Sequence, residues 1–337
     1  MSSVAVIGSG VTGLCAALHL TNQHPDLSIT VLSDQSISQN TSHGPAGICI
    51  MSHPRFRHWT KPTCERLRFL TSQYPATTTG VHLVSGWRFD DDLQLIKQEE
   101  LAGRGQYMNY RYLDADEVAN LGSPKKHAAF YTTWASHGRH YVPFLIEQLK
   151  EHGCRFAKRK VNSFSELSGS YDCVINSSGM GAAQLCDDKQ MRPNRGVLIE
   201  IDAPWLRHFY YTNSTYIIPG ATSIFIGGTR QSGRFDRTVT EVDRRDIWQR
   251  CVRLLPTIKD SATISEWCGL RPFRFANING EVKEAPRVEL ELIDTPGGTP
   301  LKVIHNYGHG PSGFVLSWGC AQDVTKLFDE SQRMARM

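Results

Sequence analysis

The segment Val4-Ala-Val-Ile-Gly8-Ser-Gly10-Val-Thr-Gly13 decides the fold. Its first four residues form a short apolar run, which is typical of a buried parallel strand. The glycines follow at once with the spacing G-x-G-x-x-G, and residues 14–20 then predict a helix. A strand, a glycine turn and a helix in this order open a dinucleotide-binding βαβ unit. The alternative is a glycine-rich packing turn that binds no ligand.

Each glycine of this motif has a different expected task. Gly8 permits the tight turn after the strand, Gly10 lets the backbone approach a pyrophosphate, and Gly13 lets the helix lie close to the strand. The start of the helix offers N–H groups to the phosphates. Asp34 lies 21 residues after Gly13, at the end of a second apolar run, and can accept hydrogen bonds from a ribose. The motif does not separate NAD from FAD, but Asp34 argues against a 2′-phosphate and hence against NADP.

Length and composition exclude several classes of protein. A chain of 337 residues suggests two domains, and 40% hydrophobic with 21% charged residues argues against disorder. The net charge of +4 is too small to indicate nucleic-acid binding, and the short basic run at 155–160 is interpreted as a solvated face. No secretory signal and no apolar run of about 18 residues is present, so no membrane span is predicted.

The cysteines argue for a reducing compartment. Their number is nine, their spacing is wide, and no C-x-x-C pair occurs. Neither a disulfide framework nor a zinc site fits this pattern, so free and mostly buried thiols are expected.

The remaining chain indicates two kinds of domain. Residues 171–183 form an apolar strand that ends in small residues, as expected at a nucleotide crevice, although an ordinary strand and turn is the alternative. Short strands with turns between them follow from residue 195 onward and suggest a mostly antiparallel sheet. Strands are predicted at 197–202, 216–219, 223–228, 288–293 and 303–305 and within 80–112, and helices at 63–75, 114–120, 141–152, 243–255 and 314–328.

The prediction is therefore an α/β fold in which a Rossmann-type domain is interleaved with a second, mostly antiparallel-sheet domain. The first is assigned residues 1–50, 140–195 and 300–337, and the second residues 51–139 and 196–299.

Taken together, these motifs resemble the family of FAD-dependent D-amino-acid oxidases, and within it the D-aspartate oxidases more closely. The resemblance covers nearly the whole chain. It rests on Val4–Gly13, Pro45–Gly47, Val174–Gly179, Tyr216–Gly220, Gly227–Gln231, Gly269–Pro272, His305–Gly310 and Ser317–Gly319. It implies an FAD-binding Rossmann-type domain, an interleaved substrate domain, and oxidative deamination of a D-amino acid. The products are a 2-oxo acid, ammonia and, from oxygen, hydrogen peroxide.

The resemblance also implies substrate contacts. Arg271 is expected to bind the α-carboxylate through two parallel hydrogen bonds, with the Tyr216 hydroxyl as its partner. Arg230 is expected to bind a second carboxylate, because oxidases of neutral D-amino acids resemble this segment but carry an aromatic or apolar residue there. The alternatives are a salt bridge for Arg271, a core aromatic role for Tyr216 and an ion pair of Arg230 with Asp236.

Two departures from the family pattern bear on the substrate. Vertebrate D-aspartate oxidases carry another arginine before the Tyr-Ile motif, whereas residues 208–213 read His-Phe-Tyr-Tyr-Thr-Asn here, with Tyr211 expected near the pocket mouth. Pro311 stands where relatives carry Gly or Ser; its carbonyl can accept from the substrate amine, but it has no N–H. His53 is a further candidate for the distal carboxylate, with a polar surface role as the alternative.

The cofactor implied by the resemblance is FAD, with no acid or base catalyst and no metal. His305 and His309 are interpreted as structural because glycines interrupt their loop, although His309 is also expected near the flavin. The predicted cofactor-binding residues are Gly8, Ser9, Gly10, Val11, Thr12, Gly13, Asp34 and Gln35 for the ADP half, Thr41, Ser42 and Ser178 near the pyrophosphate, Val161 at the adenine, and Ala46, Gly47, Ile48, Gly310, Gly313, Phe314 and Val315 at the isoalloxazine.

Three functions stay open at this point. They are oxidation of acidic D-amino acids (D-aspartate, with D-glutamate as a second substrate), oxidation of D-amino acids with broad or neutral preference, and nucleotide binding without turnover. The expected partners are a small D-amino acid and oxygen, not nucleic acid or membrane, and a homo-oligomer is left open. The ending Ala335-Arg336-Met337 resembles a peroxisomal address read by an import receptor; without it the expected location is cytoplasmic.

Overall fold

The computed structural model describes residues 2–295 and 298–334, so the expected address at Ala335–Met337 lies outside the described residues. The chain divides into two compact units. Unit 1 comprises Met1–His43, Val142–Asn194 and Arg271–Met337, and unit 2 comprises Gly44–Tyr141 and Arg195–Leu270. The predicted domains differ from these units mainly in two stretches: residues 44–50 group with unit 2, and residues 271–299 group with unit 1.

Unit 1 is built around a mostly parallel sheet. Its strands are β1 (Ser3–Ile7), β2 (Ser28–Ser33), β6 (Arg155–Lys158), β7 (Cys173–Asn176), β15 (Arg287–Ile293) and β16 (Leu301–Tyr307), in the order β15-β16-β7-β1-β2-β6. All neighbours pair in parallel except β15 and β16. The strand predicted at 288–293 therefore belongs to this sheet, and its placement in the antiparallel sheet of the second domain was wrong. Its alternating pattern fits an edge strand of either sheet.

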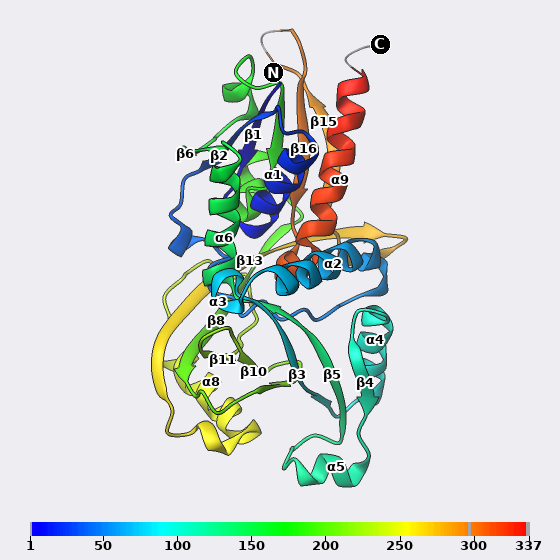
Figure 1. The fold of residues 1–337 in the computed structure, drawn as a ribbon, viewed down its shortest axis with the longest axis vertical. Coiled ribbons are helices and arrows are strands. Elements are labelled where there is room, and N and C mark those ends of the chain that lie inside the picture. Colours follow the sequence, from blue (N-terminus) through cyan, green and yellow to red (C-terminus); the bar gives the residue numbers. More distant parts are fainter. Residues whose placement is uncertain (1, 296–297, 335–337) are drawn as a thin grey trace. The chain divides into compact units, whose positions relative to one another are not determined.

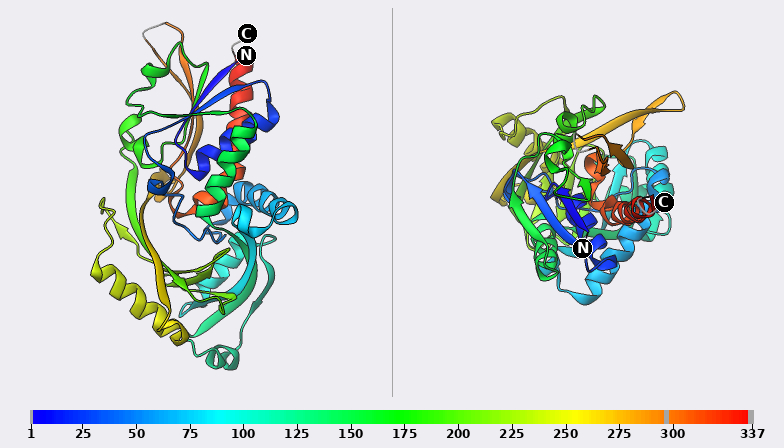
Figure 2. Two further views of the ribbon diagram at one scale, coloured as in Figure 1. Left: turned by 60° about the vertical axis from the view of Figure 1, so that its left-hand side comes forward. Right: turned by 90° about the horizontal axis from the view of Figure 1, so that it is seen from above.

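Two helices cover one face of this sheet. α1 (Val11–Gln23) and α9 (Gly313–Met334) lie side by side against it (Figures 1 and 2). α1 begins directly after Gly10 and buries Leu14, Ala17 and Leu18, so the apolar residues after the glycine motif form the helix–sheet core. α6 (Gly138–Glu151) and the short α7 (Ala182–Leu185) complete the helices of this unit.

Unit 2 is built around a mostly antiparallel sheet. Its strands run in the order β13-β8-β11-β10-β9-β3-β5-β4, and β12 pairs with β8. β3 and β9 pair in parallel, whereas the pairs β8–β11, β11–β10, β10–β9, β3–β5 and β5–β4 are antiparallel. The strands are β3 (Val81–Asp90), β4 (Met108–Tyr112), β5 (His127–Ser136), β8 (Met191–Asp202), β9 (His208–Tyr211), β10 (Tyr216–Pro219), β11 (Ile224–Gly227), β12 (Gln231–Ser232) and β13 (Ala262–Ile278); β14 (Glu281–Glu284) pairs with the far end of β13.

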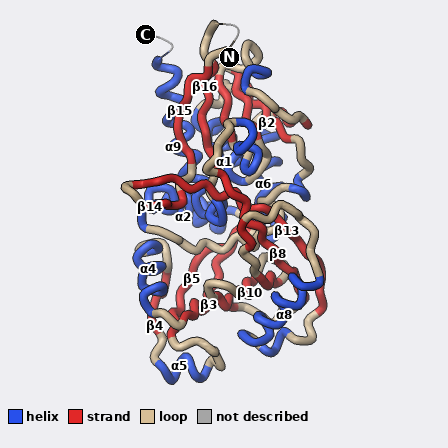
Figure 3. The backbone as a smooth tube through the Cα atoms, turned by 180° about the vertical axis from the view of Figure 1, so that it is seen from behind, coloured by secondary structure: helices blue, strands red, loops and turns tan. Residues whose placement is uncertain are grey.

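The helices of unit 2 pack on this sheet. α8 (Glu241–Leu254) contacts β11, and α4 (Leu93–Gly103) contacts β3 and β5 (Figure 3). The others are α2 (Arg57–Gln73), α3 (Ala76–Thr79) and α5 (Ala115–Asn120). The apolar cluster beneath α8 includes Ile199, Ile226, Ile247 and Cys251, all fully buried.

One segment has a secondary structure that was not predicted. Strands were expected within residues 80–112, and β3 and β4 lie there, but Leu93–Gly103 between them is the helix α4. The Asp92 carboxylate caps it by accepting a hydrogen bond from the Gln94 N–H at 2.8 Å. The residues that follow are mostly Leu, Gln, Lys and Glu, which favour a helix. Turn chemistry and helix propensity therefore outweigh the alternation seen around this segment.

All nine cysteines are free, and seven of them are buried. No helix in residues 2–295 and 298–334 is long and apolar enough to cross a bilayer. The same residues contain no group of three or more His, Cys, Asp or Glu side chains arranged to hold a metal ion.

Candidate active site

A groove in unit 1 brings together five of the predicted cofactor residues. Gly8, Asp34, Gln35, Val161 and Ser178 all line it, at the carboxyl ends of β1, β2 and β7. In a parallel α/β sheet this edge is where nucleotides bind. The other lining residues are Ile7, Leu32, Ser33, Arg159, Lys160, Asn162, Gly181, Gln184 and Leu185.

Gly8 and Gly13 are required by the protein's own packing. A Cβ added to Gly8 would overlap the carbonyl oxygen of Ser177, and Gly8 has a φ of +105°. A Cβ on Gly13 would overlap the Gly8 carbonyl oxygen. These two glycines therefore let β1, β7 and α1 meet at the groove.

Gly10 is not required for packing in the same way. A Cβ there would lie 3.4 Å from Ser42 Oγ and no closer to any other atom, which is ordinary contact. Gly10 is also the N-cap of α1 and provides no side-chain cap. Packing therefore does not explain the glycine at this position, and the close approach of a pyrophosphate to the helix start stays a prediction.

The loop at residues 40–42 lies at the same helix start. Ser42 Oγ accepts a hydrogen bond from the Val11 N–H at 3.1 Å, and Asn40 Oδ1 accepts one from the Ser42 N–H at 2.9 Å. Thr41 lies half-buried between them. On the other side of the motif, the Ser9 hydroxyl donates to Ser33 Oγ at 3.0 Å. The predicted pyrophosphate-side residues and the glycine motif therefore form one local structure, with Thr12 in the first turn of α1.

The C-terminal loop also ends near α1. Gly310, Pro311 and Ser312 form a 3₁₀ turn, and α9 then starts at Gly313. A Cβ on Gly313 would lie 3.8 Å from Val11 Cγ1, so the starts of α1 and α9 are neighbours. Pro311 is exposed and lies in the first turn, where a missing N–H breaks no helical bond. The local fold thus accommodates the departure at Pro311; Phe314 and Val315 follow in the first turn of α9.

The two histidines of this loop have separate environments. His305 uses both ring nitrogens, with Glu291 Oε2 at 2.8 Å and Asn176 Nδ2 at 3.2 Å, which supports the structural interpretation. His309 is buried, and burial lowers the pKa of its ring to about 4. It is therefore neutral near pH 7.

The segment Ala46–Ile48 of unit 2 pairs with the end of β5. Gly47 has a φ of +66°, and its carbonyl accepts from the Ser136 N–H at 3.0 Å. Ile48 forms a β-bridge with Ala135. Only glycine fits at residue 47, because a Cβ would overlap the Ser136 carbonyl oxygen.

Three predicted substrate residues gather within unit 2. Tyr211 on β9 lies directly opposite Tyr216 on β10, which lies opposite Gly227 on β11. Residues paired in this way point to the same face of a sheet. The Tyr216 ring lies over Gly227 and Gly228, since a Cβ on either glycine would overlap it. Arg230 follows two residues later and is exposed.

Arg230 contacts Tyr211. Burial is the largest effect on the Tyr211 hydroxyl and raises its pKa, Glu99 raises it further, and the nearby Arg230 guanidinium lowers it through its charge and a hydrogen bond. The alternative partner of Arg230, Asp236, instead pairs with Arg195 and Arg234 at 3.2 and 2.9 Å. No acidic residue in the described part of the chain forms an ion pair with Arg230.

Arg271 and His53 have local partners. The Arg271 guanidinium in unit 1 is half-buried and donates to Asn194 Oδ1 at 3.3 Å. His53 is exposed, and its Nδ1 accepts from the Arg55 N–H at 3.1 Å at the start of a 3₁₀ turn. This bond matches the alternative of a polar surface residue, and a substrate role for His53 stays a prediction.

A buried charge pair next to Tyr211 was not predicted from the sequence. Arg88 is 1% exposed, donates to Glu99 Oε2 at 2.9 Å, and stacks over the Tyr211 ring at 5.2 Å. Burial raises the pKa of Glu99 despite this arginine. Arg88 lies on a strand and Glu99 on a helix, and nothing in the sequence pattern indicates that these two charged residues are in contact.

The residues of unit 1 fit a flavin dinucleotide. The groove combines Gly8 of the glycine motif, the acid Asp34 directly after β2 and two basic side chains, Arg159 and Lys160. Ser177 Oγ is buried beside Gly8 and has no hydrogen-bond partner among the described residues. Backbone amides, cationic groups and an unpaired hydroxyl suit the ADP half of such a molecule.

Comparisons with known proteins agree with this geometry. The family model for FAD-dependent oxidoreductases of the DAO type matches residues 3–327. D-aspartate oxidase 1 of Caenorhabditis elegans is 35% identical over 339 residues, covering 99% of both sequences. Human D-aspartate oxidase is 32% identical and covers 97% of this chain and 94% of its own.

Among solved structures, glycine oxidase from Bacillus cereus has a similar fold. The TM-score is 0.78 at 19% identity, and the match covers 98% of this chain and 96% of that one. The predicted fold class is confirmed, and so is FAD as the cofactor. The chain belongs to the DAO family of FAD-dependent oxidoreductases.

Proposed function

We propose that this flavoenzyme oxidises acidic D-amino acids, D-aspartate above all and D-glutamate in second place, to the 2-oxo acid, ammonia and hydrogen peroxide. Two similar proteins that cover nearly the whole chain are named D-aspartate oxidases, which supports the proposal.

The observation that carries the acidic preference is the environment of Arg230. It is an exposed cation beside Tyr211 and near Tyr216, and no described acid neutralises it. A guanidinium in this state suits the distal carboxylate of the substrate. A neutral side chain would leave it unpaired when the substrate is bound, so neutral substrates should bind less well.

Arg271 and Tyr216 are proposed to hold the α-carboxylate, which every amino acid carries. Contacts at both carboxylates would restrict how the Cα–H bond of the substrate is oriented, and this orientation is the contribution that we propose for these residues. Held by residues of the unit 1 groove such as Gly8 and Asp34, FAD would supply the redox chemistry of the deamination, with oxygen as the final electron acceptor. No side chain of the proposed site is required as an acid or base for this step, so binding and orientation are the protein's contribution.

The first prediction concerns the purified holoenzyme under anaerobic conditions. We expect D-aspartate to bleach the visible flavin band at concentrations roughly 100-fold lower than D-alanine, because one desolvated charge-assisted contact contributes about 2–3 kcal/mol. Stopped-flow absorbance at a series of concentrations measures this. Equal potency of the two substrates would support a broad or neutral preference, which the absence of an arginine in residues 208–213 favours.

The second prediction concerns Arg230→Leu. We expect kcat/KM for D-aspartate to fall roughly 100-fold and that for D-alanine to change less than threefold, because only the first substrate has a second carboxylate. Oxygen consumption with both substrates measures the ratio. Arg245→Leu is the control, since Arg245 is an exposed arginine of α8 in the same unit and lies outside the Arg230 segment. A parallel fall for both substrates would contradict the role given to Arg230.

A further inference from the structure

The segment that carries Arg230 has little regular structure of its own. It runs from Thr229 to Thr240, between β11 and α8, and after the two-residue strand β12 it is a turn and a loop. A loop of this length keeps one conformation only if side chains fix it, because backbone ordering costs about 1–2 kcal/mol per residue. The position of an exposed side chain on it depends on those contacts.

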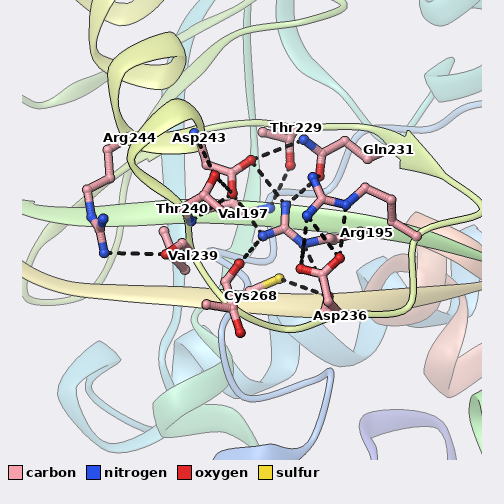
Figure 4. Close-up of polar contacts among 12 residues, drawn as sticks. Arg195, Val197, Thr229, Gln231, Asp236, Val239, Thr240, Asp243, Arg244 and Cys268 are labelled. Carbon is pink, nitrogen blue, oxygen red and sulfur yellow. Dashed lines mark hydrogen bonds and ion pairs between the residues drawn. The ribbon is translucent and has the colours of Figure 1, made fainter.

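Arg195 of β8 supplies most of these contacts (Figure 4). It is fully buried, and its guanidinium donates to the Asp236 carbonyl at 3.1 Å, to the Thr238 carbonyl and to the Gln231 side-chain oxygen. It also donates to both carboxylate oxygens of Asp243 at 3.1 and 2.8 Å. The whole donor fork of Arg195 is therefore directed at the segment and the first turn of α8.

Asp243 closes the network from the other side. Its carboxylate accepts from Gln231 Nε2 at 3.0 Å, and from the Thr240 N–H at 3.0 Å and hydroxyl at 2.8 Å. Burial raises the pKa of Asp243, but the bonds from Arg195 and Thr240 outweigh it and hold the pKa well below its usual range. Asp243 is thus a charged anchor, 3% exposed, at neutral pH.

Both sequence neighbours of Arg230 are held by β8. Thr229 Oγ1 accepts from the Val197 N–H at 2.8 Å, and Gln231 is bonded to Arg195 and Asp243. Arg230 itself stays exposed and contacts Tyr211. The buried network therefore fixes the backbone on each side of the one cation that the substrate side chain would meet.

We propose that Arg195, acting with Asp243 and Gln231, is a positioning residue for Arg230 and so sets the preference for a second carboxylate. This inference rests on the proposed function. A displacement of about 1 Å at a binding group can lower activity by as much as 10²-fold, so small shifts of the segment affect an acidic substrate strongly. A neutral substrate does not use Arg230 and is affected far less.

The test compares Arg195→Lys and Gln231→Ala with the wild-type holoenzyme. Lysine keeps the charge but loses the fork, and we expect KM for D-aspartate to rise roughly tenfold or more. KM for D-alanine and both kcat values should change less than twofold. Arg139→Lys is the control, because Arg139 pairs with Glu200 of the same unit and does not contact the segment. Gln231→Ala leaves the Arg195–Asp243 pair intact. If Arg195→Lys does not fold, Gln231→Ala is used instead, and the same selective rise in KM for D-aspartate is expected.

The double variant Arg195→Lys with Arg230→Leu distinguishes positioning from a general structural role. If Arg195 acts through Arg230, the first substitution adds no further rise in KM for D-aspartate once Arg230 is gone. Equal losses on D-aspartate and D-alanine, or additive losses in the double variant, would overturn the inference while leaving the proposed function intact. If Arg230→Leu alone leaves the substrate ratio unchanged, the proposed function fails first.

Discussion

Replacing Arg271 by leucine is expected to lower kcat/KM for D-aspartate and for D-alanine alike, by roughly 200- to 1,000-fold. The physical reason is the α-carboxylate, which both substrates carry. Removing one partner of a desolvated, hydrogen-bonded charge pair costs about 3–4 kcal/mol, and each 1.36 kcal/mol is tenfold in rate. If the contact is equally strong in the ground and transition states, the fall in kcat/KM should come mostly from a rise in KM.

Steady-state oxygen consumption with both substrates measures this effect. Arg271→Lys keeps the charge but offers no parallel pair of donors, so it should recover only part of the activity. Arg192→Leu is the control, since Arg192 donates to backbone carbonyls of Lys189 and Met191 and has no proposed substrate role. The comparison with Arg230→Leu is the informative one: loss of Arg271 should not change the ratio of the two substrates, whereas loss of Arg230 should. An Arg271→Leu enzyme within threefold of wild type would contradict the assignment.

Replacing Gly8 by alanine is expected to destabilise the apoprotein by about 2–5 kcal/mol and to abolish FAD binding. Two penalties add. A side chain at a φ of +105° costs about 1–2 kcal/mol, and forcing the new Cβ against the Ser177 carbonyl oxygen costs about 1–3 kcal/mol more. Urea unfolding of the apoprotein and titration with FAD measure the two effects.

Two other glycines separate these contributions. Gly153 has a φ of +77° with no atom within 4 Å of an added Cβ, so Gly153→Ala isolates the backbone penalty. Gly10→Ala introduces no overlap and should leave the unfolding free energy of the apoprotein unchanged. It should weaken FAD binding by roughly tenfold or more, because the added methyl group would stand where we expect the pyrophosphate to approach. A Gly8→Ala protein as stable as Gly153→Ala would show that the close approach to Ser177 does not matter.

The sequence pattern predicts the nucleotide half of this protein well because its signals are local. The apolar run, the glycine spacing and Asp34 all lie within the first 34 residues, and the structure places Gly8 and Asp34 along one groove. The packing found at Gly8 and Gly13 matches the roles that the spacing predicts for them. The helix α4 was missed because its cap at Asp92 is a single side-chain bond inside an alternating stretch.

The network around Arg195 could not be predicted for a different reason. Arg195 lies 36 residues from Gln231 and 48 residues from Asp243. Helix and strand periodicity relates residues only a few positions apart, so it cannot predict these contacts. In the sequence, nothing distinguishes Arg195 from an ordinary polar residue at the start of a strand. The pairing of β12 with β8 brings Gln231 to Arg195, and the packing of α8 on the sheet brings Asp243, so the contacts depend on tertiary structure. The contacts among Arg88, Glu99 and Tyr211 likewise depend on tertiary structure and could not be predicted from local sequence.

The order of the unit 1 strands has a consequence for biosynthesis. β1 leaves the ribosome first, but its neighbour β7 follows some 170 residues later, and α9, which packs on α1, is the last helix described. At about 5–20 residues per second, the nascent chain carries an incomplete nucleotide sheet for on the order of half a minute. We therefore expect complete flavin binding only after β16 and α9 have been synthesised.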